Sequence, residues 1–182
     1  MLPVFAIVAL DLPIVGLTVE ATGDTMYSTK NDIAADVREK VIILLNARLA
    51  DAVDLMMQAK QAHWNVKGPN FHGLHELFDE LNGEMREYVD TIAERAVILG
   101  GEARGSTRHA VEASKLPAYP EGVSDWKGHV DALSTSVAAF AKNIRAAIKL
   151  TEELGDAGTA DLFTEVSRGV DKRLWMIEAH LG

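Results

Sequence analysis

A forced break between two long helical patterns is the strongest constraint on how this chain folds. Apolar residues recur at helical spacing up to His63 and again after Phe71, and Gly68-Pro69 lies between the two patterns. Proline interrupts a helix because it lacks a backbone N–H and clashes with the preceding turn. The sequence therefore predicts two long antiparallel helices joined by a tight turn at Lys67–Asn70.

Three side chains suited to metal binding lie around this turn. His63 comes about one turn before it and His75 about one turn after it, so antiparallel helices place the two imidazoles at the same height. Asp79 lies four residues after His75 and shares its helix face. Two imidazole nitrogens and a carboxylate oxygen form a ligand set suited to a first-row divalent metal.

The second of these helices carries another acidic pair, Asp90 and Glu94, which are also four residues apart. The midpoint of this pair lies 15 residues beyond the midpoint of His75 and Asp79, which is roughly 22 Å along a helix axis. Metal–ligand bonds are only about 2.0–2.2 Å long, so one chain cannot close a site from both pairs. Two copies packed antiparallel across a two-fold axis can close it, and they form two equivalent sites.

These side chains together resemble the motif of a known family, the Dps proteins or mini-ferritins, which are DNA-binding proteins from starved cells. The resemblance extends from about Tyr27 to His180. It implies a ferroxidase centre between two subunits, with three ligands from one subunit and two from the other. The matching segments are His63-Trp64-Asn65, then His75-x-x-x-Asp79, then Asp90-x-x-x-Glu94.

The resemblance also implies a function, an assembly and a location. It implies oxidation of Fe(II), typically by hydrogen peroxide, and storage of ferric mineral in a hollow homo-oligomer, a dodecamer. Removing iron and peroxide together prevents hydroxyl-radical formation and so protects DNA. Iron is the expected cofactor, with no organic cofactor, and the expected location is the cytoplasm. The acidic residues Glu80, Glu84 and Glu87 are interpreted as a solvated face or as the lining of the mineral cavity.

Hydrophobic periodicity along the rest of the chain predicts an all-α, ferritin-like four-helix bundle. The first helix is expected to begin after Asn31 or Asp32, either of which can cap it. Gly100-Gly101 is expected to end the second helix. The other three helices are expected at about residues 71–99, 124–154 and 159–180. A long crossover at residues 101–122, with a short helix near 107–114, allows the third helix to run parallel to the second.

Two further assignments depend on the resemblance. In the family, acidic residues at the start of the last helix line pores on three-fold axes, through which iron enters; Asp161 matches that position and Glu165 lies one turn later. The alternative role of these carboxylates is structural, because negative charge near a helix N-terminus is favourable without any ligand.

Trp64, adjacent to His63, has two interpretations, as an electron donor to a stray oxidant or as a residue that packs the turn.

Residues 1–30 are expected to form a poorly ordered apolar tail, and residues 31–182 a single domain. Asp11 would lie near the centre of any membrane helix in the tail, at a cost of about 2.5–3.5 kcal/mol. No Lys or Arg precedes Lys30, whereas a signal peptide normally begins with a basic region. A secretion signal, or a start misassigned upstream of Met26, is the alternative interpretation.

Composition and missing motifs help to distinguish the ferroxidase from the alternative functions. A DNA-compacting protein is the second hypothesis. The net charge is -9 and neither terminus carries a basic cluster, so only weak DNA binding is expected. The chain has no cysteine, which excludes disulfides and thiolate metal sites. No Glu is followed three residues later by His, which disfavours a di-iron site built within one bundle. A catalytically silent bundle would leave the five ligand-type residues unexplained.

Overall fold

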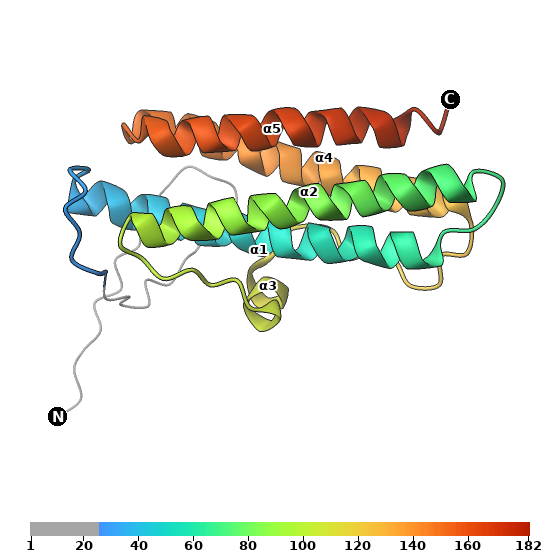
Figure 1. The fold of residues 1–182 in the computed structure, drawn as a ribbon, viewed down its shortest axis with the longest axis horizontal. Helices are drawn as coiled ribbons and strands as arrows, with labels where there is room; N and C mark the ends of the chain where they lie inside the picture. Colours follow the sequence, from blue (N-terminus) through green and yellow to red (C-terminus); the bar gives the residue numbers. More distant parts are fainter. Residues whose placement is uncertain (1–25) are drawn as a thin grey trace.

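Five α-helices account for most of residues 26–182, the part of the chain that the computed structural model describes (Figure 1). None of these residues lies in a β-strand. The all-α class, the four long helices and the short helix in the crossover confirm the predicted fold. The helices are α1 (Ala35–Asn65), α2 (Phe71–Ile98), α3 (Thr107–Ala113), α4 (Trp126–Glu153) and α5 (Ala157–Glu178). Most of the predicted N-terminal tail lies outside the described residues.

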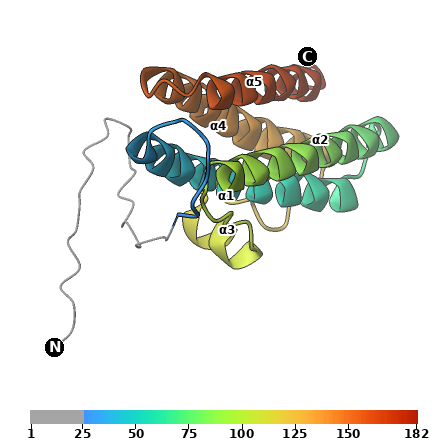
Figure 2. The same ribbon diagram turned by 60° about the vertical axis from the view of Figure 1, so that its left-hand side comes forward.

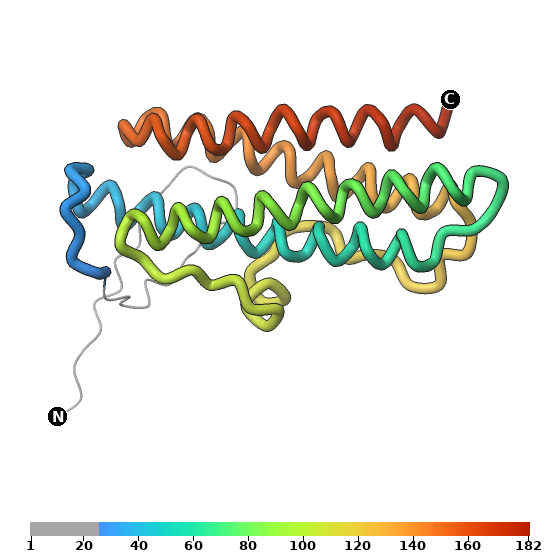
Figure 3. The backbone as a smooth tube through the Cα atoms, in the orientation of Figure 1, coloured from blue at the N-terminus to red at the C-terminus, as the bar shows by residue number. Residues whose placement is uncertain are grey.

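The four long helices form two antiparallel hairpins that pack side by side (Figures 1 and 2). One hairpin pairs α1 with α2, and the other pairs α4 with α5. The crossover returns along α1 through α3, so α4 runs parallel to α2, as predicted (Figure 3). The bundle thus has a hairpin end, with the α1–α2 turn and the start of α4, and a far end, with the α4–α5 turn.

A continuous apolar core joins the two hairpins, because each long helix repeats apolar residues every three or four positions. Phe78, Phe140 and Phe163 come from α2, α4 and α5 and are completely buried. Burial of such aromatic side chains contributes roughly 3–5 kcal/mol each, judged by their truncation to alanine. No helix among the described residues has the length and hydropathy needed to cross a membrane.

A buried carboxylate attaches the crossover to the bundle. Asp51 is completely buried in α1. Its Oδ1 accepts the Lys115 backbone N–H at 2.8 Å, and its Oδ2 accepts from Asn143 Nδ2 at 3.1 Å. The Arg48 guanidinium lies 3.1 Å from the same Oδ2 and supplies the opposite charge. A buried charge requires such partners, so Asp51 holds α1, α4 and the crossover at one point.

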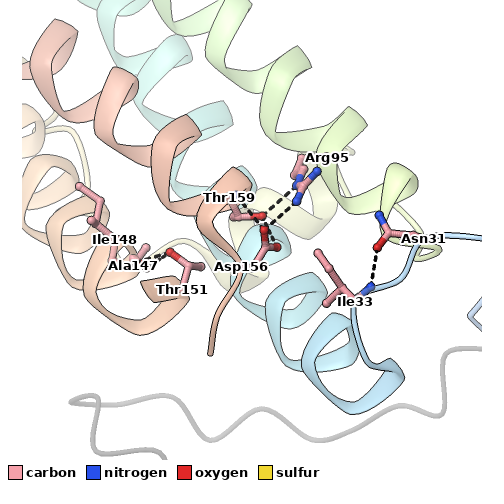
Figure 4. Close-up of polar contacts among 8 residues, drawn as sticks. All are labelled: Asn31, Ile33, Arg95, Ala147, Ile148, Thr151, Asp156 and Thr159. Carbon is pink, nitrogen blue, oxygen red and sulfur yellow. Dashed lines mark hydrogen bonds and ion pairs between the residues drawn. The ribbon is translucent and has the colours of Figure 1, made fainter. Parts of the chain in front are cut away.

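The start of α1 differs from the prediction. The helix begins at Ala35, and Ala34 is its N-cap with no side-chain hydrogen bond. The Asn31 Oδ1 instead accepts the Ile33 N–H at 3.0 Å, in a local turn that precedes the helix (Figure 4). The prediction that Asn31 or Asp32 caps α1 is therefore wrong, because the Asn31 side chain is used two residues further along the chain.

The end of α2 confirms the prediction made from its glycines. Gly100 has a φ of +94°, a left-handed conformation that glycine adopts without steric cost. Its N–H donates to the Val97 carbonyl, and the Gly101 N–H donates to the Ala96 carbonyl, both at 2.9 Å. This pair of bonds is a Schellman motif. The Tyr27 N–H donates to the Gly100 carbonyl at 2.6 Å, so the segment before α1 is attached here.

At the far end, Arg95 of α2 holds the start of α5 in what we call the Arg95 clamp (Figure 4). Asp156 caps α5, because its Oδ1 accepts the Thr159 N–H at 3.0 Å and its Oδ2 accepts the Thr159 hydroxyl at 2.6 Å. Arg95 donates from Nη2 to Asp156 Oδ1 at 2.7 Å and from Nε to Thr159 Oγ1 at 2.8 Å. Asp156 is only 1% exposed, so its charge depends on these partners.

We expect Asp156→Ala to lower the free energy of unfolding by about 3 kcal/mol, because it removes the α5 cap and leaves Arg95 without its anion. The matched control is Asp171→Ala, which breaks an ion pair with Arg145 in which both side chains are 51% exposed; it should cost at most about 1 kcal/mol. Denaturant unfolding at one fixed protein concentration measures both losses. Equal losses would contradict the role assigned to the clamp.

Candidate metal centre

His63 and His75 meet across the α1–α2 hairpin, as their spacing around the turn predicts. Their ring centroids are 3.7 Å apart and the ring planes differ by 21°. His63 Nδ1 lies 2.8 Å from the His75 carbonyl oxygen, and His75 Nδ1 lies 2.8 Å from the His63 carbonyl oxygen. The hairpin therefore holds the two imidazoles as a reciprocal pair.

These reciprocal contacts fix the tautomer of both rings. A backbone carbonyl can only accept a hydrogen bond, so each Nδ1 carries the hydrogen and donates it. In the neutral ring, Nε2 then keeps its lone pair. Metal-binding histidines commonly have one nitrogen held in this way while the other binds the metal. The two Nε2 atoms are thus the nitrogen donors that the hairpin offers to a metal.

Asp79 lies one turn after His75, and Lys60 of α1 binds its carboxylate. Lys60 Nζ donates to Asp79 Oδ1, and the Asp79 side chain is 50% exposed. This hydrogen bond holds the pKa of Asp79 below its ordinary value, and the imidazoles of His63 and His75 act in the same direction. Asp79 is therefore a carboxylate, the form that binds a metal, throughout the neutral pH range.

The sequence reasoning missed Lys60, although a usable signal was present. Lys60 lies three residues before His63, so the two side chains share a face of α1. Its ammonium stands beside Asp79, where a bound metal would also lie. A divalent cation that binds this carboxylate must therefore displace or share the ammonium, since two cations cannot approach it equally closely without repulsion.

Asp90 and Glu94 lie in the last third of α2, toward the far end of the bundle, and both are exposed. The structure does not bring them near the imidazole pair. Within residues 26–182, no group of three or more His, Asp or Glu side chains could hold a metal ion. The described part of the chain therefore separates the predicted ligands into two groups, one at the hairpin and one near the end of α2.

The two carboxylates assigned to a pore lie on the second and third turns of α5. Asp161 and Glu165 are both exposed. Asp161 lines an open depression beside the α4–α5 turn, together with Glu152 and Thr164. The Arg95 clamp holds the same turn, so the backbone beside the depression is held in place by contacts with α2.

Aromatic residues flank the hairpin without being buried by it. Trp64 is 60% exposed and Phe71 is 45% exposed. The Phe71 ring centroid lies 5.1 Å from that of His75. Packing of the turn within one chain therefore does not account for Trp64, and its role as an electron donor stays a prediction.

Arg173 of α5 changes the interpretation of the acidic face of α2. It donates from Nε to Glu84 Oε2 at 2.5 Å and from Nη1 to Glu80 Oε2 at 2.6 Å. The Tyr88 hydroxyl donates to the other Glu84 oxygen at 2.8 Å. Glu80 and Glu84 are thus paired rather than simply solvated. No local pattern predicts this contact, because Arg173 lies almost a hundred residues away from its partners along the chain.

Comparison with known proteins supports the same fold and family. A family profile described as a ferritin-like domain matches residues 42–182. The DNA protection during starvation protein of Agrobacterium fabrum is 45% identical over 155 residues, which cover 85% of this chain and 96% of that protein. The corresponding protein of Brevibacillus brevis is 32% identical and covers 80% of this chain and 97% of its own length.

Solved structures agree with this result. DpsC from Streptomyces coelicolor superposes with a TM-score of 0.83 at 34% identity, covering 87% of this chain and 92% of that chain. The bundle and the matched domain define a ferritin-like protein. Within that class, the chain belongs to the Dps family, which confirms the resemblance drawn from its motif.

We expect Lys60→Met to raise the affinity for Zn²⁺ several-fold, because the metal no longer competes with the ammonium for Asp79. Zn²⁺ is a suitable probe because it binds imidazole and carboxylate without redox chemistry, and titration calorimetry on the assembled protein measures its affinity. The matched control is Lys40→Met, which removes a lysine paired with Asp36 elsewhere on α1. Weaker binding in Lys60→Met would show instead that Lys60 is needed to orient Asp79.

Proposed function

We propose that this protein is a ferroxidase that oxidises Fe(II) at centres shared between two subunits and stores the ferric product inside a homo-oligomeric shell. The observation that carries the proposal is the reciprocal pair of His63 and His75, with two Nε2 donors beside the ionised Asp79. Fe(II) accepts both imidazole nitrogen and carboxylate oxygen. Iron is here the substrate and the stored cargo.

The proposed centre is completed by the partner subunit. Asp90 and Glu94 are on the same straight helix as His75 and Asp79, roughly 22 Å away along the axis, so they serve a different centre from the one at their own hairpin. Two α2 helices that cross antiparallel on a two-fold axis bring these two carboxylates to the imidazole pair of the neighbouring subunit. The exposed apolar side chains at the hairpin support burial in such an interface.

The negative charge of the proposed ligands favours oxidation of bound Fe(II) to Fe(III). Three carboxylates and two neutral imidazoles neutralise Fe(III) better than Fe(II), which favours loss of an electron. Hydrogen peroxide takes one electron from each of two Fe(II) ions, its O–O bond breaks, and two protons complete two water molecules. Taking the electrons in pairs avoids the hydroxyl radical that a single Fe(II) releases from peroxide. The assignment of peroxide as oxidant follows the family resemblance.

Transport and storage use the far end of the bundle. In a hollow dodecamer, the depression lined by Asp161 would lie at a three-fold contact, where its carboxylates attract Fe(II) electrostatically. Glu165, one turn further along α5, extends the same acidic path. We assign the protein to the cytoplasm, where removal of iron and peroxide protects DNA chemically, without requiring tight DNA binding.

The shared centre is tested by mixing two inactive variants. One carries His63→Ala and His75→Ala, and the other carries Asp90→Ala and Glu94→Ala. Each homo-oligomer should lose rapid Fe(II) oxidation, because every centre lacks one half. After disassembly, mixing and reassembly with random pairing, half of the two-fold dimers contain one chain of each kind. One of their two centres is intact, so roughly a quarter of all centres should recover.

The mixing experiment needs two controls. Each variant is also disassembled and reassembled alone, and neither should regain oxidation. The composition of the hybrids is confirmed by native mass spectrometry with one variant isotopically labelled. Hybrids of confirmed mixed composition that remain inactive at every mixing ratio would contradict the shared centre and show that the ligands are assigned to the wrong chains.

DNA binding is expected to be weak. The net charge is -9, and electrostatic contacts with phosphates supply most non-specific DNA affinity. A gel-shift titration of the assembled protein with duplex DNA, in about 150 mM salt, should show no stable complex. A tight complex under these conditions would favour the DNA-compacting alternative.

A further inference from the structure

The hairpin end of the bundle contains a second polar pair that the proposed iron centre does not use. The hydroxyl oxygen of Tyr119, in the crossover, lies 2.6 Å from Nδ1 of His129 in the first turn of α4. The two rings are stacked at an angle of 23°. His129 is only 1% exposed and Tyr119 is half-buried. This is a short, preformed hydrogen bond between a phenol and an imidazole.

Tyr119 is the donor in this bond. The backbone of Asn65, the last residue of α1, favours protonation of the His129 ring, although Nε2 is buried and forms no hydrogen bond of its own. A phenol is a better hydrogen-bond donor than acceptor toward an imidazole, so we assign the shared hydrogen to Tyr119 and the ring hydrogen to Nε2, which leaves Nδ1 as the acceptor. Burial raises the pKa of Tyr119 to about 12 and lowers the pKa of His129. At neutral pH a neutral phenol thus donates to a neutral imidazole.

The pair lies against the turn that carries the proposed iron ligands. Asn65 follows Trp64 directly and comes two residues after His63. The first turn of α4 packs on the same turn, because a Cβ added at Gly68 would lie 3.0 Å from Trp126 Cδ1. The phenol–imidazole pair, two indoles and the imidazoles of the iron centre therefore gather at one end of the bundle.

We propose that Tyr119 and His129 form a proton-coupled electron donor that quenches one-electron oxidants released during iron oxidation. The inference rests on the proposed function for its oxidant, the hydroxyl radical formed when a single Fe(II) reduces peroxide. The radical takes one electron from Tyr119 and becomes hydroxide. The phenolic O–H bond breaks and its proton forms an N–H bond at His129 Nδ1. The products are a neutral tyrosyl radical, an imidazolium and hydroxide, so atoms and charge balance.

The imidazole is what distinguishes Tyr119 from the other tyrosines. Oxidation of a phenol without a base leaves a strongly acidic radical cation, and transfer of the proton along an existing hydrogen bond avoids that state. Tyr88 is also half-buried, but its hydroxyl donates to the Glu84 carboxylate, and a carboxylate is a weaker base than an imidazole. Tyr27 is 64% exposed. Tyr88 is therefore the matched control for Tyr119.

The first test uses iron-free, assembled protein in a Tyr27→Phe background. Azide radicals from pulse radiolysis oxidise the indoles that stay accessible in the assembly, and the electron that refills the oxidised indole is expected to come from Tyr119. The tyrosyl absorbance should then grow as the indolyl absorbance decays. Tyr119→Phe should abolish most of this growth, and Tyr88→Phe should leave it unchanged. His129→Gln, which keeps a polar side chain but no base, should slow it at least about tenfold.

The opposite results would overturn the inference. Tyrosyl growth that persists in Tyr119→Phe, or an unchanged rate in His129→Gln, would show that the pair is only a structural contact. Variants are compared only as assemblies of unchanged size and helicity. If Tyr119→Phe fails to assemble, the rate in His129→Gln, together with its slowing in deuterium oxide for the parent protein, decides the matter.

A second arm separates this inference from the proposed function. Protein loaded with less than one Fe(II) per centre is mixed with peroxide, freeze-quenched and measured by electron paramagnetic resonance. A tyrosyl signal that is lost in Tyr119→Phe supports both proposals. A Tyr119 signal with azide radicals but none with iron and peroxide supports the redox pair and contradicts the iron centre as its source of oxidant. Absence of the signal in both arms overturns the pair.

Discussion

The rigidity of α2 is the constraint on which the proposed two-chain iron centre depends. A helix rises 1.5 Å per residue, so side chains 15 residues apart on it cannot reach one metal ion. The structure keeps α2 unbroken from Phe71 to Ile98, and it leaves the acidic pair near its end exposed. In the proposed assignment each end of α2 carries half of an iron centre, so a second copy of the chain is needed to complete either half and assembly becomes a condition of the proposed chemistry.

The two ends of the bundle are stabilised by different means. At the hairpin end, each of two imidazoles donates to the backbone of the other, so the ligand nitrogens are oriented by the chain itself. At the far end, an arginine from α2 holds the capping aspartate of α5. Arg95 directly follows Glu94, so the same turn of helix carries a proposed ligand outward and a structural anchor inward. Preorganisation of this kind is what a functional site requires of its supporting residues.

Much of this structure could be predicted from local sequence patterns. Gly68-Pro69 identified the hairpin, Gly100 the end of α2, and the spacing of His63 and His75 the contact between their rings. The contacts that could not be predicted join residues far apart in the chain. They include the pairing of Glu80 and Glu84 with Arg173, and the bond between Tyr119 and His129. Asn31 shows a further limit, because a side chain that can cap a helix can equally close the turn before it.

Each proposed iron centre draws its ligands from two chains, and anomalous diffraction can locate the iron relative to both chains. Crystals of the assembled protein, loaded anaerobically with Fe(II), would be measured on both sides of the iron absorption edge. We expect anomalous density about 2.0–2.2 Å from ligand atoms of His63, His75 and Asp79 in one chain and of Asp90 and Glu94 in its two-fold mate. Iron bound at full occupancy by side chains of a single chain would contradict it.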